Sequence, residues 1–507
     1  MMAPVHDDAL HDSHAIEQLE QAFLDPVLAD RVDSVVRPLG GERYRVASRD
    51  GSVEFERLSS DGRHGYRTVA TTGRDPLVRI DDDALLGLQA EESDRWPTRD
   101  RTSFPHAFDS IAQFFDSSVA PDLYVNHTAA HTREGHLGHH GSLGIVQARA
   151  PFIAAGAGVR PLGVLDRSTR VVDVAPTIAA LLDLDAHPDA VGPTGERRLD
   201  GRLRRQDGDP ITDVLTGDRA EQMVVVLLDG CNANLLHDVV DAGEAPHLAD
   251  LIGRGVAMRR GSFASLPTAT LANHTTAVTG AHPGHSGVLH NAWVDRSDGA
   301  QPDLLSMEEM FWSSGYVRDD VETLFEALAR SRPGAFSSAT FEFCDRGADF
   351  SSFGLVRAGS GERLPSIDDV VHVDRSCAAR SGAYSFMSCV DHVSLAHTVS
   401  CWNQEHGNPL PALTWCSLAV TDEAGHESGP HGELARAAVL DSDARLGELV
   451  ATVERAGELD RTAFVVIADH GMEQSDPDVD RPWEADLADC GIPHRIVGDG
   501  LVYVEWT

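Results

Sequence analysis

Three uninterrupted apolar runs constrain the fold of this chain more than any other feature. They are residues 223–228 (MVVVLL), 412–420 (ALTWCSLAV) and 462–468 (TAFVVIA). Such runs, without alternating polar residues, are typical of strands buried on both faces of a parallel sheet. An aspartate follows each run directly or within two residues, at Asp229, Asp422 and Asp469. Because α/β folds place their ligands at the carboxyl ends of parallel strands, we expect an α/β sheet with these carboxylates at one edge.

The N-terminal part of the chain predicts further elements. We expect a helix over about 14–29 and a hairpin around an Asp50–Gly51 turn, where residues 43–58 alternate in polarity. Short buried strands are expected at 123–125 and 150–155. An apolar helix is expected over 171–184, with a proline near its start.

Composition divides the chain into three parts. Residues 186–221 are rich in Gly, Pro, Arg and Asp and predict a linker between residues 1–185 and 222–507. Residues 295–405 are less regular, and we interpret them as an insertion or cap. With 507 residues, the chain can form one large α/β domain with insertions, or two or three smaller domains.

The charge balance limits the partners. The chain has 80 acidic and 42 basic residues, a formal net charge of -38, and its basic residues are all arginine. Nucleic acids and anionic membranes need cationic patches, so we predict neither as a partner. Substrate phosphates would have to be held by metals or arginine. The oligomeric state stays open.

Cysteine usage and the first residues bear on localisation. The seven cysteines show no CxxC spacing. The first 21 residues have no basic or apolar signal region, and no run of about 18 apolar residues occurs. We therefore predict a reducing, cytoplasmic setting.

Candidate metal ligands cluster after two of the apolar runs. Asp469 and His470 are adjacent at a strand end, where both can face one metal. Asp422 and His426 lie four residues apart, which places them on one side of a helical turn, and Gly425 lets the backbone approach a metal. Taken singly, each pair also fits a turn, a cap or a solvated loop.

A candidate nucleophile lies in the segment Pro267–His274 (PTATLANH). A helix over 270–280 would place Thr270 in its first turn, in positive potential beside free N–H groups. A metal would lower the pKa of this hydroxyl further. Asn273, one turn on, could donate to a phosphoryl oxygen. The alternative is that Thr268 or Thr270 is an N-cap.

The last candidate ligand comes from a histidine-rich stretch far from the others. Residues 127–140 contain five histidines. His140, which precedes a glycine and the strand at 150–155, is the most specific of them. We interpret His136 and His139 as its neighbours.

Together these motifs resemble the type I phosphodiesterase/nucleotide pyrophosphatase family of the alkaline phosphatase superfamily. The resemblance rests on Asp229-Gly230, Pro267–His274, Thr279–Gly287, Asp422–His426 and Asp469–Gly471. It implies an alkaline-phosphatase-like, mostly parallel sheet between helices, and two divalent metal ions, zinc first and manganese as the alternative. It also implies a phosphodiesterase or pyrophosphatase that acts on a small phosphorylated substrate through a phosphothreonine.

The resemblance further implies roles for individual residues. Asp229, Thr270, Asp469 and His470 would hold one zinc. Asp422, His426 and His140 would hold the other, and Asn273 would help to hold the phosphoryl oxygens.

Two departures from the family pattern matter. Leu271-Ala272 replace a Phe-Pro pair whose Phe stacks on the base in nucleotide-cleaving members, which weakens the case for a nucleotide. The His140 motif precedes the other motifs instead of following them. We therefore expect a circular permutation; a fusion of two partial modules, with the site completed between chains, is the alternative.

Two other functions stay open. One is a phosphonate hydrolase similar to phosphonoacetate hydrolase, although that relative uses lysines and this chain has none. The other is a metal-binding pseudoenzyme, which the retention of every ligand position disfavours.

Overall fold

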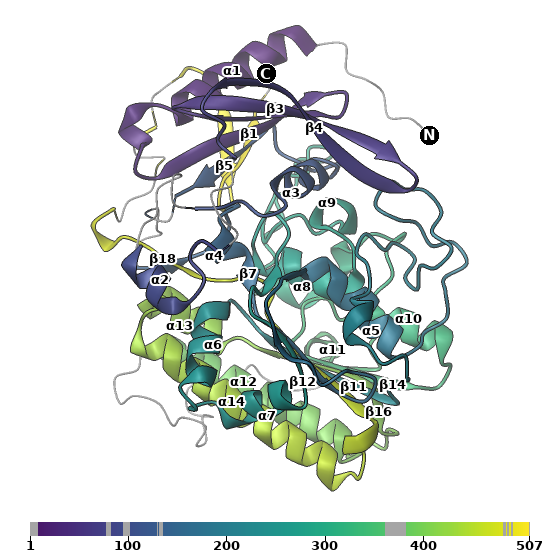
Figure 1. Ribbon diagram of the computed structural model, residues 1–507. Helices are drawn as coiled ribbons and strands as arrows, with labels where there is room; N and C mark the ends of the chain where they lie inside the picture. Colours follow the sequence, from purple (N-terminus) through teal and green to yellow (C-terminus); the bar gives the residue numbers. More distant parts are fainter. Residues whose placement is uncertain are drawn as a thin grey trace.

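The computed structural model describes most of the chain. The described residues are 9–77, 83–94, 102–128, 130, 135–359, 382–479, 483, 486–487 and 490–505. They form a mixed central sheet between helices and a second, antiparallel sheet at one end of the molecule (Figure 1).

The central sheet has eight strands. In spatial order they are β15 (Phe350–Ser351), β14 (Phe336–Thr340), β16 (Pro411–Leu418), β11 (Gln222–Leu228), β17 (Thr462–Ile467), β8 (Phe152–Gly156), β12 (Gly255–Met258) and β9 (Gly163–Leu165). Only β8 runs against its neighbours; the other pairs are parallel. The three apolar runs are the adjacent strands β16, β11 and β17. The prediction of a mostly parallel α/β sheet is therefore confirmed.

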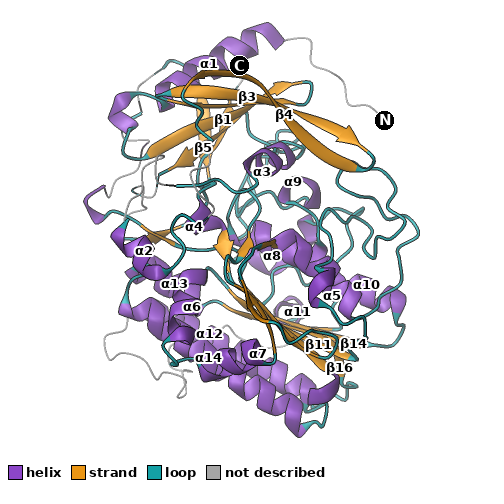
Figure 2. Cartoon of the chain, in the orientation of Figure 1, coloured by secondary structure: helices purple, strands orange, loops and turns teal. Residues whose placement is uncertain are grey.

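Helices cover both faces of this sheet (Figure 2). One face carries α6 (Ala233–Asp241), α7 (Pro246–Gly253), α12 (Gly382–Trp402), α13 (Val420–Ser428) and α14 (Glu433–Arg455). The other carries α5 (Val174–Leu181), α8 (Thr270–Thr279), α10 (Leu324–Ser331) and α11 (Ser352–Arg357), and α9 (Pro283–Ser286) packs against α8. Local signals set several of these ends: α7 starts on a proline, α10 has a capping box, and α8 ends at Gly280, whose φ of 68° suits glycine.

The second sheet has seven strands, and every neighbouring pair is antiparallel. Their order is β19 (His494–Val497), β20 (Leu501–Val504), β5 (Leu123–His127), β1 (Val32–Gly40), β2 (Arg43–Ser48), β3 (Gly51–Ser60) and β4 (Arg63–Gly73). The predicted hairpin is β2–β3. Helix α1 (Ala9–Phe23) packs its Leu19 and Phe23 against β1 and β5. Strands from both ends of the sequence therefore share one sheet.

The remaining elements are short. The helices are α2 (Leu88–Ser93), α3 (Ala107–Phe114) and α4 (Ile145–Ala148). The 3₁₀ turns are η1 (Pro26–Leu28), η3 (Val171–Asp173), η4 (Thr212–Val214), η5 (Met310–Tyr316), η7 (Leu459–Arg461) and η8 (Pro477–Val479). Two small sheets are β10 (Thr169–Arg170) with β13 (Ser262–Phe263) and β7 (Arg149–Ala150), and β18 (Glu473–Gln474) with β6 (Gly138–His139).

Some boundaries differ from the predictions. The helix expected to reach residue 29 ends at Phe23, since Pro26 starts a separate 3₁₀ turn. The helix expected over 171–184 begins as the turn η3, and its α-helical part is α5.

The three predicted parts of the chain are in close contact. Residues 1–185 contribute β8 and β9 to the central sheet, and residues 295–405 contribute β14 and β15. The segment 186–221 buries Ala190, Leu203 and Val214 in the main core.

Two further predictions concern the surroundings of the chain. No helix among the described residues is long and apolar enough to cross a membrane. The six cysteines that are described are free thiols, and the cytoplasmic setting stays a prediction.

Candidate active site

The carboxylates meet at the carboxyl ends of the central strands. Asp229 directly follows β11, and Asp469 lies two residues beyond the last residue of β17. Asp422 lies in the first turn of α13, which follows β16. The backbone N–H of Gly230 donates to Asp469 Oδ1 at 3.0 Å, which ties two of the strand ends together.

The first cluster contains Asp229, Asp469 and His470. One ligand atom from each lies within 4.8 Å of the others, and all three residues are buried. His470 Nε2 lies 3.1 Å from Asp469 Oδ2 and 3.9 Å from Asp229 Oδ1. Thr270 Oγ1 lies 3.4 Å from the same nitrogen, so the hydroxyl borders this cluster.

The second cluster contains His140, Asp422 and His426, whose ligand atoms also lie within 4.8 Å of one another. His140 Nε2 is 3.2 Å from His426 Nε2 and 3.8 Å from Asp422 Oδ1. His426 Nε2 is 3.4 Å from Asp422 Oδ2. The rings of His140 and His470 stack at 3.8 Å, so the two clusters adjoin.

Backbone contacts bring His140 to this position within a single chain. Leu137 N–H donates to His426 O at 2.7 Å, and His426 Nδ1 is 2.9 Å from Gly138 O. A Cβ at Gly138 would lie 2.2 Å from Gly425 O, so this approach requires glycine. His140 Nδ1 is 2.8 Å from Thr268 O, which sets the orientation of the ring.

Unpaired oxygens indicate that both clusters suit metal ions. Asp229 Oδ1, Asp422 Oδ1 and Asp469 Oδ2 are buried and have no hydrogen-bond partner. Burying such groups without a partner is costly, and a cation between them would remove the cost. The buried His/Asp clusters are therefore consistent with a metal site.

The electrostatics of the clusters agree with this. Burial, followed by the nearby carboxylates, raises the pKa of Asp229 to about 7. Burial also raises the pKa of Asp469 to about 6. Burial lowers the pKa of His140 and of His470, and so favours the neutral imidazole that binds metals.

Thr270 begins helix α8, as predicted. The N-cap is Ala269, which makes no side-chain cap, so the alternative that Thr268 or Thr270 is a cap is wrong. Thr268 instead donates from Oγ1 to Ser142 O at 3.0 Å and accepts from Gly141 N–H at 2.8 Å. It links the nucleophile segment to the His140 loop.

The expected contact between Asn273 and a phosphoryl oxygen needs correction. Asn273 is fully buried, and its Oδ1 accepts from Ser265 N–H at 2.8 Å. Its Nδ2 donates to Pro267 O at 2.8 Å, with Ser265 O and Ala269 O slightly farther. Both ends of the amide therefore hold the loop before Thr270 in place.

Two residues near Thr270 were missed by sequence reasoning. Asn291 lines the cavity, and its Oδ1 accepts from Leu271 N–H at 2.9 Å. No local pattern marks it, because it reaches α8 from a loop. His274 could have been found from its spacing, since it lies one helical turn after Thr270 on the same face.

His274 connects the first cluster to a buried carboxylate. Its Nε2 is 3.7 Å from Asp229 Oδ2, and its Nδ1 is 2.9 Å from Glu342 Oε2. Burial alone would lower the pKa of His274, but the Glu342 and Asp229 carboxylates outweigh it and hold the pKa well above its usual range. Ser417 Oγ and Cys344 N–H also donate to Glu342.

A cavity of about 410 Å³ opens over both clusters. On the polar side it is lined by Thr270, Asn291, His274 and ligand candidates from both clusters, with His136 and His139 as neighbours. Its opposite wall is apolar.

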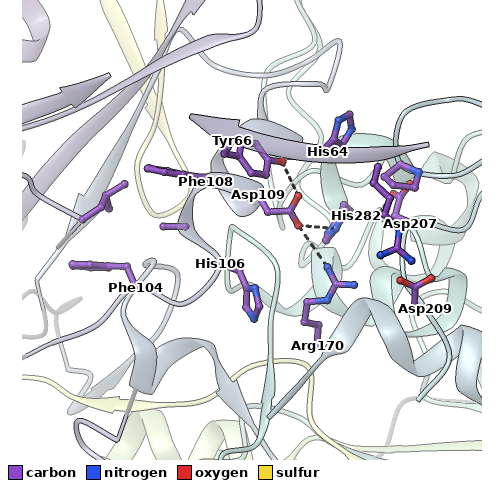
Figure 3. Close-up of a pocket in the computed structure, with 14 residues that line it drawn as sticks. His64, Tyr66, Phe104, His106, Phe108, Asp109, Arg170, Asp207, Asp209 and His282 are labelled. Atoms are coloured by element: carbon purple, nitrogen blue, oxygen red, sulfur yellow. Dashed lines mark hydrogen bonds and ion pairs between the residues drawn. The ribbon is translucent and has the colours of Figure 1, made fainter. Parts of the chain in front are cut away.

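A second cavity, of about 440 Å³, lies away from these clusters (Figure 3). Its central carboxylate, Asp109, accepts from Tyr66 Oη at 2.7 Å. Asp109 also lies 3.6 Å from His282 Nε2 and 3.7 Å from Arg170 Nη1. Its polar groups pair with one another, and neither candidate metal cluster borders it.

Solved structures of three proteins give partial matches. Murine ectonucleotide pyrophosphatase/phosphodiesterase 5 matches at 19% identity over 49% of this chain and 57% of its own, with a TM-score of 0.35. The human protein of that name matches at 17% over 50% and 57%, with a TM-score of 0.36. Phosphonoacetate hydrolase from Sinorhizobium meliloti 1021, in complex with phosphonoformate, matches at 20% over 50% and 58%, with a TM-score of 0.32. The chain thus spans little more than half the length of each relative.

The family comparison covers more of the chain. The model of the type I phosphodiesterase / nucleotide pyrophosphatase family matches residues 223–496, which is more than half of the 507 residues. The match includes the three strands that precede the cluster carboxylates, β11, β16 and β17. It also includes Thr270 and every other ligand candidate except His140. This protein therefore belongs to the type I phosphodiesterase / nucleotide pyrophosphatase family of hydrolases, within the alkaline phosphatase superfamily.

Proposed function

We propose that this protein is a two-metal phosphodiesterase that acts through a covalent phosphothreonine. The observation that carries the proposal is the position of Thr270. Its hydroxyl lies at the first residue of α8, 3.4 Å from His470 Nε2, beside one buried and one partly buried triad of ligand candidates. Family membership supports a phosphorylated small molecule as the substrate.

The residues present fit two divalent ions. Asp229, Asp469, His470 and Thr270 would hold one, and His140, Asp422 and His426 the other. Mixed histidine and carboxylate ligands suit zinc, with manganese as the alternative. When bound, the ions supply positive charge that favours the Thr270 alkoxide and stabilises charge on the phosphoryl oxygens.

The chain's own residues then perform the transfer. Thr270 Oγ1 attacks phosphorus after losing its proton to solvent; an Oγ1–P bond forms, and the P–O bond to the leaving alcohol breaks. The departing alkoxide takes a proton from water. A water molecule then hydrolyses the phosphothreonine and restores the hydroxyl.

Two features orient the phosphoryl group. The N-terminal end of α8, where Thr270 lies, carries the positive end of the helix dipole and favours negative charge on the reacting oxygen. In place of Asn273, we propose that Asn291 donates its side-chain amide to a phosphoryl oxygen. Asn291 lines the cavity and is held by Leu271 N–H.

A substrate panel tests the proposal. The metal-loaded protein should hydrolyse bis(4-nitrophenyl) phosphate faster than 4-nitrophenyl phosphate or a phosphonate. Preference for the phosphonate would support the phosphonoacetate hydrolase-like alternative. Stoichiometric metal binding without turnover of any ester would support the pseudoenzyme.

We also propose that the chain is a circular permutation of the family order. In support, His140 from residues 1–185 adjoins Asp422 and His426 within one chain, and β20 shares a sheet with β1. A rearranged gene that starts near residue 222 and joins residue 505 to residue 9 by a flexible linker should yield a folded, metal-binding protein. A misfolded product from several linker lengths would contradict the proposal.

A further inference from the structure

The wall that faces the metal clusters is apolar and comes from one region of the chain. It is made of Leu305, Met307, Met310, Phe311, Phe341, Phe343, Phe353, Phe386, Met387 and Val390. These residues come from η5, α11, α12 and the loops that flank η5 and follow β14. A cavity with an apolar wall opposite a few polar groups is typical of a site that binds an amphipathic small molecule.

Aromatic packing gives this wall a defined shape. The Phe353 ring contacts the rings of Phe311, Phe341 and Phe343 edge-on, at centroid distances of 5.1, 5.7 and 5.6 Å. Phe341 has a φ of 49°, which is rare for a bulky residue and points to a constraint imposed by its surroundings. Phe343 also packs edge-on against His274 at 5.2 Å, so the wall reaches the histidine that lies beside Asp229 of the first cluster.

The charges in the cavity favour a substrate with a single negative charge. The proposed metal ions would face one phosphoryl group, and His274 already pairs with Glu342 at 2.9 Å. None of the described residues that line the cavity is arginine, and Glu423 and Asp499 add negative charge. A second phosphate, as in a diphosphate or dinucleotide, would therefore find no unpaired cationic side chain among them.

Two apolar residues at the edge of the cavity are exposed. Leu305 and Met307, which we call the rim, line the cavity and are 48 and 53% exposed. Exposed apolar residues next to a cavity can mark a binding surface, whereas scattered ones are ordinary.

We propose that the substrate is a phosphodiester monoanion that carries a bulky apolar group, an aryl or long alkyl chain. This inference rests on the proposed phosphodiesterase function. The phosphoryl group lies at the metal clusters, and the apolar group packs against the Phe353 cluster. The rim at Leu305 and Met307 receives the apolar group from solvent or from a lipid surface.

A series of 4-nitrophenyl esters of methyl, butyl and octyl phosphate tests the proposal, at concentrations below micelle formation. We expect kcat/KM to rise at least tenfold from methyl to octyl, mainly through KM. The 4-nitrophenyl ester of thymidine 5′-phosphate and a dinucleoside diphosphate should be poorer than the octyl ester. A flat series, or preference for the nucleotides, would overturn the proposal.

Binding measurements separate this inference from the proposed function. If the protein cleaves no diester, the phosphodiesterase assignment fails. Calorimetry with metal-loaded Thr270→Ala then still tests the cavity, because dibutyl phosphate should bind at least tenfold more tightly than dimethyl phosphate or diphosphate. Equal affinities would overturn the proposal independently of turnover.

Two variants test whether the apolar wall causes the preference for the octyl ester. Phe386→Ala, which shortens the apolar wall, should lower the octyl-to-methyl ratio of kcat/KM fivefold or more. Phe108→Ala in the second cavity is the matched control and should leave the ratio unchanged. An unchanged ratio in Phe386→Ala would show that the apolar wall stabilises the fold and does not bind the substrate, which would overturn the proposal.

The rim is tested with vesicles that contain the octyl ester. Met307→Gln should reduce turnover of the vesicle-bound ester more than that of the dissolved ester if a lipid surface is the source. Equal effects of the substitution on turnover of the vesicle-bound and the dissolved ester would show that the substrate enters from solution. Leu199→Gln, at an exposed apolar position outside the rim, is the control.

Discussion

Removal of the Thr268 hydroxyl tests how the two parts of the chain are held together. Thr268→Val keeps the shape of the side chain but removes two hydrogen bonds, from Gly141 N–H at 2.8 Å and to Ser142 O at 3.0 Å. Both backbone groups belong to buried residues, so their lost partner is not replaced by water. The variant therefore disturbs the loop that carries His140.

The expected effect can be worked out from these contacts. A buried polar group left without a partner costs about 1–3 kcal/mol, and two such groups give about 2–6 kcal/mol of lost unfolding free energy. That exceeds the roughly 1 kcal/mol of a lost helix cap. Because Thr268 O also orients His140, we expect the second metal to bind about 10–100-fold more weakly.

Urea unfolding of the metal-free and metal-loaded forms gives the change in unfolding free energy. Zinc competition with a chromogenic chelator gives the change in metal affinity. Thr276→Val serves as the control, since it removes a buried hydroxyl of α8 that donates to Ala272 O at 2.9 Å and contacts neither the His140 loop nor a ligand candidate. A change in unfolding free energy below about 0.5 kcal/mol, with unchanged zinc affinity, would refute the reasoning.

Further predictions concern the nucleophile, the amides and one buried carboxyl group. Thr270→Ala should lower kcat roughly 10³-fold or more while the protein stays folded. Single-turnover kinetics with an aryl diester measure this, and near-normal turnover in the variant would contradict the role of Thr270 as nucleophile. Asn291→Ala should lower kcat about 10²-fold with little loss of stability. Asn273→Ala should chiefly lower the unfolding free energy, by about 2–4 kcal/mol. Urea unfolding and kcat for both variants distinguish the two roles, and a reversed pattern would restore Asn273 as the phosphoryl contact. Burial raises the pKa of Glu91 to about 8 from its ordinary value of 4.5, so between these values the folded state holds a proton that the unfolded state has released. The contribution of Glu91 to stability therefore falls as pH rises through this window, by up to roughly 1.4 kcal/mol per pH unit. Glu91→Gln should remove that slope from the unfolding free energy of the metal-loaded protein. Identical pH profiles of the unfolding free energy in the two proteins would show that Glu91 ionises normally.

The sequence by itself determined the centre of the fold and most of the candidate ligands. The runs that became β11, β16 and β17 contain no charged residue and are mostly apolar, because strands buried on both faces exclude water from both sides. Asp229, Asp469 and His470 lie within three residues of the ends of their strands, so a local pattern sufficed to place them at one sheet edge. The helix that starts at Thr270 was likewise predictable, because its glycine stop at Gly280 is local.

The tertiary structure decided how distant segments meet. The reversed direction of β8 and the sharing of one sheet by β1 and β20 depend on pairings between residues hundreds of positions apart. No local pattern encodes such pairings, since a strand carries the same alternation of side chains in either direction.

The orientation of side chains at the site was also a tertiary result. Asn273 and Asn291 are the same residue type near one helix, yet the first holds the loop before Thr270 and the second lines the cavity. The Phe353 cluster joins residues from three separate segments. Which atoms a buried polar or aromatic group contacts depends on every element packed around it, and those contacts exist only once the chain has folded.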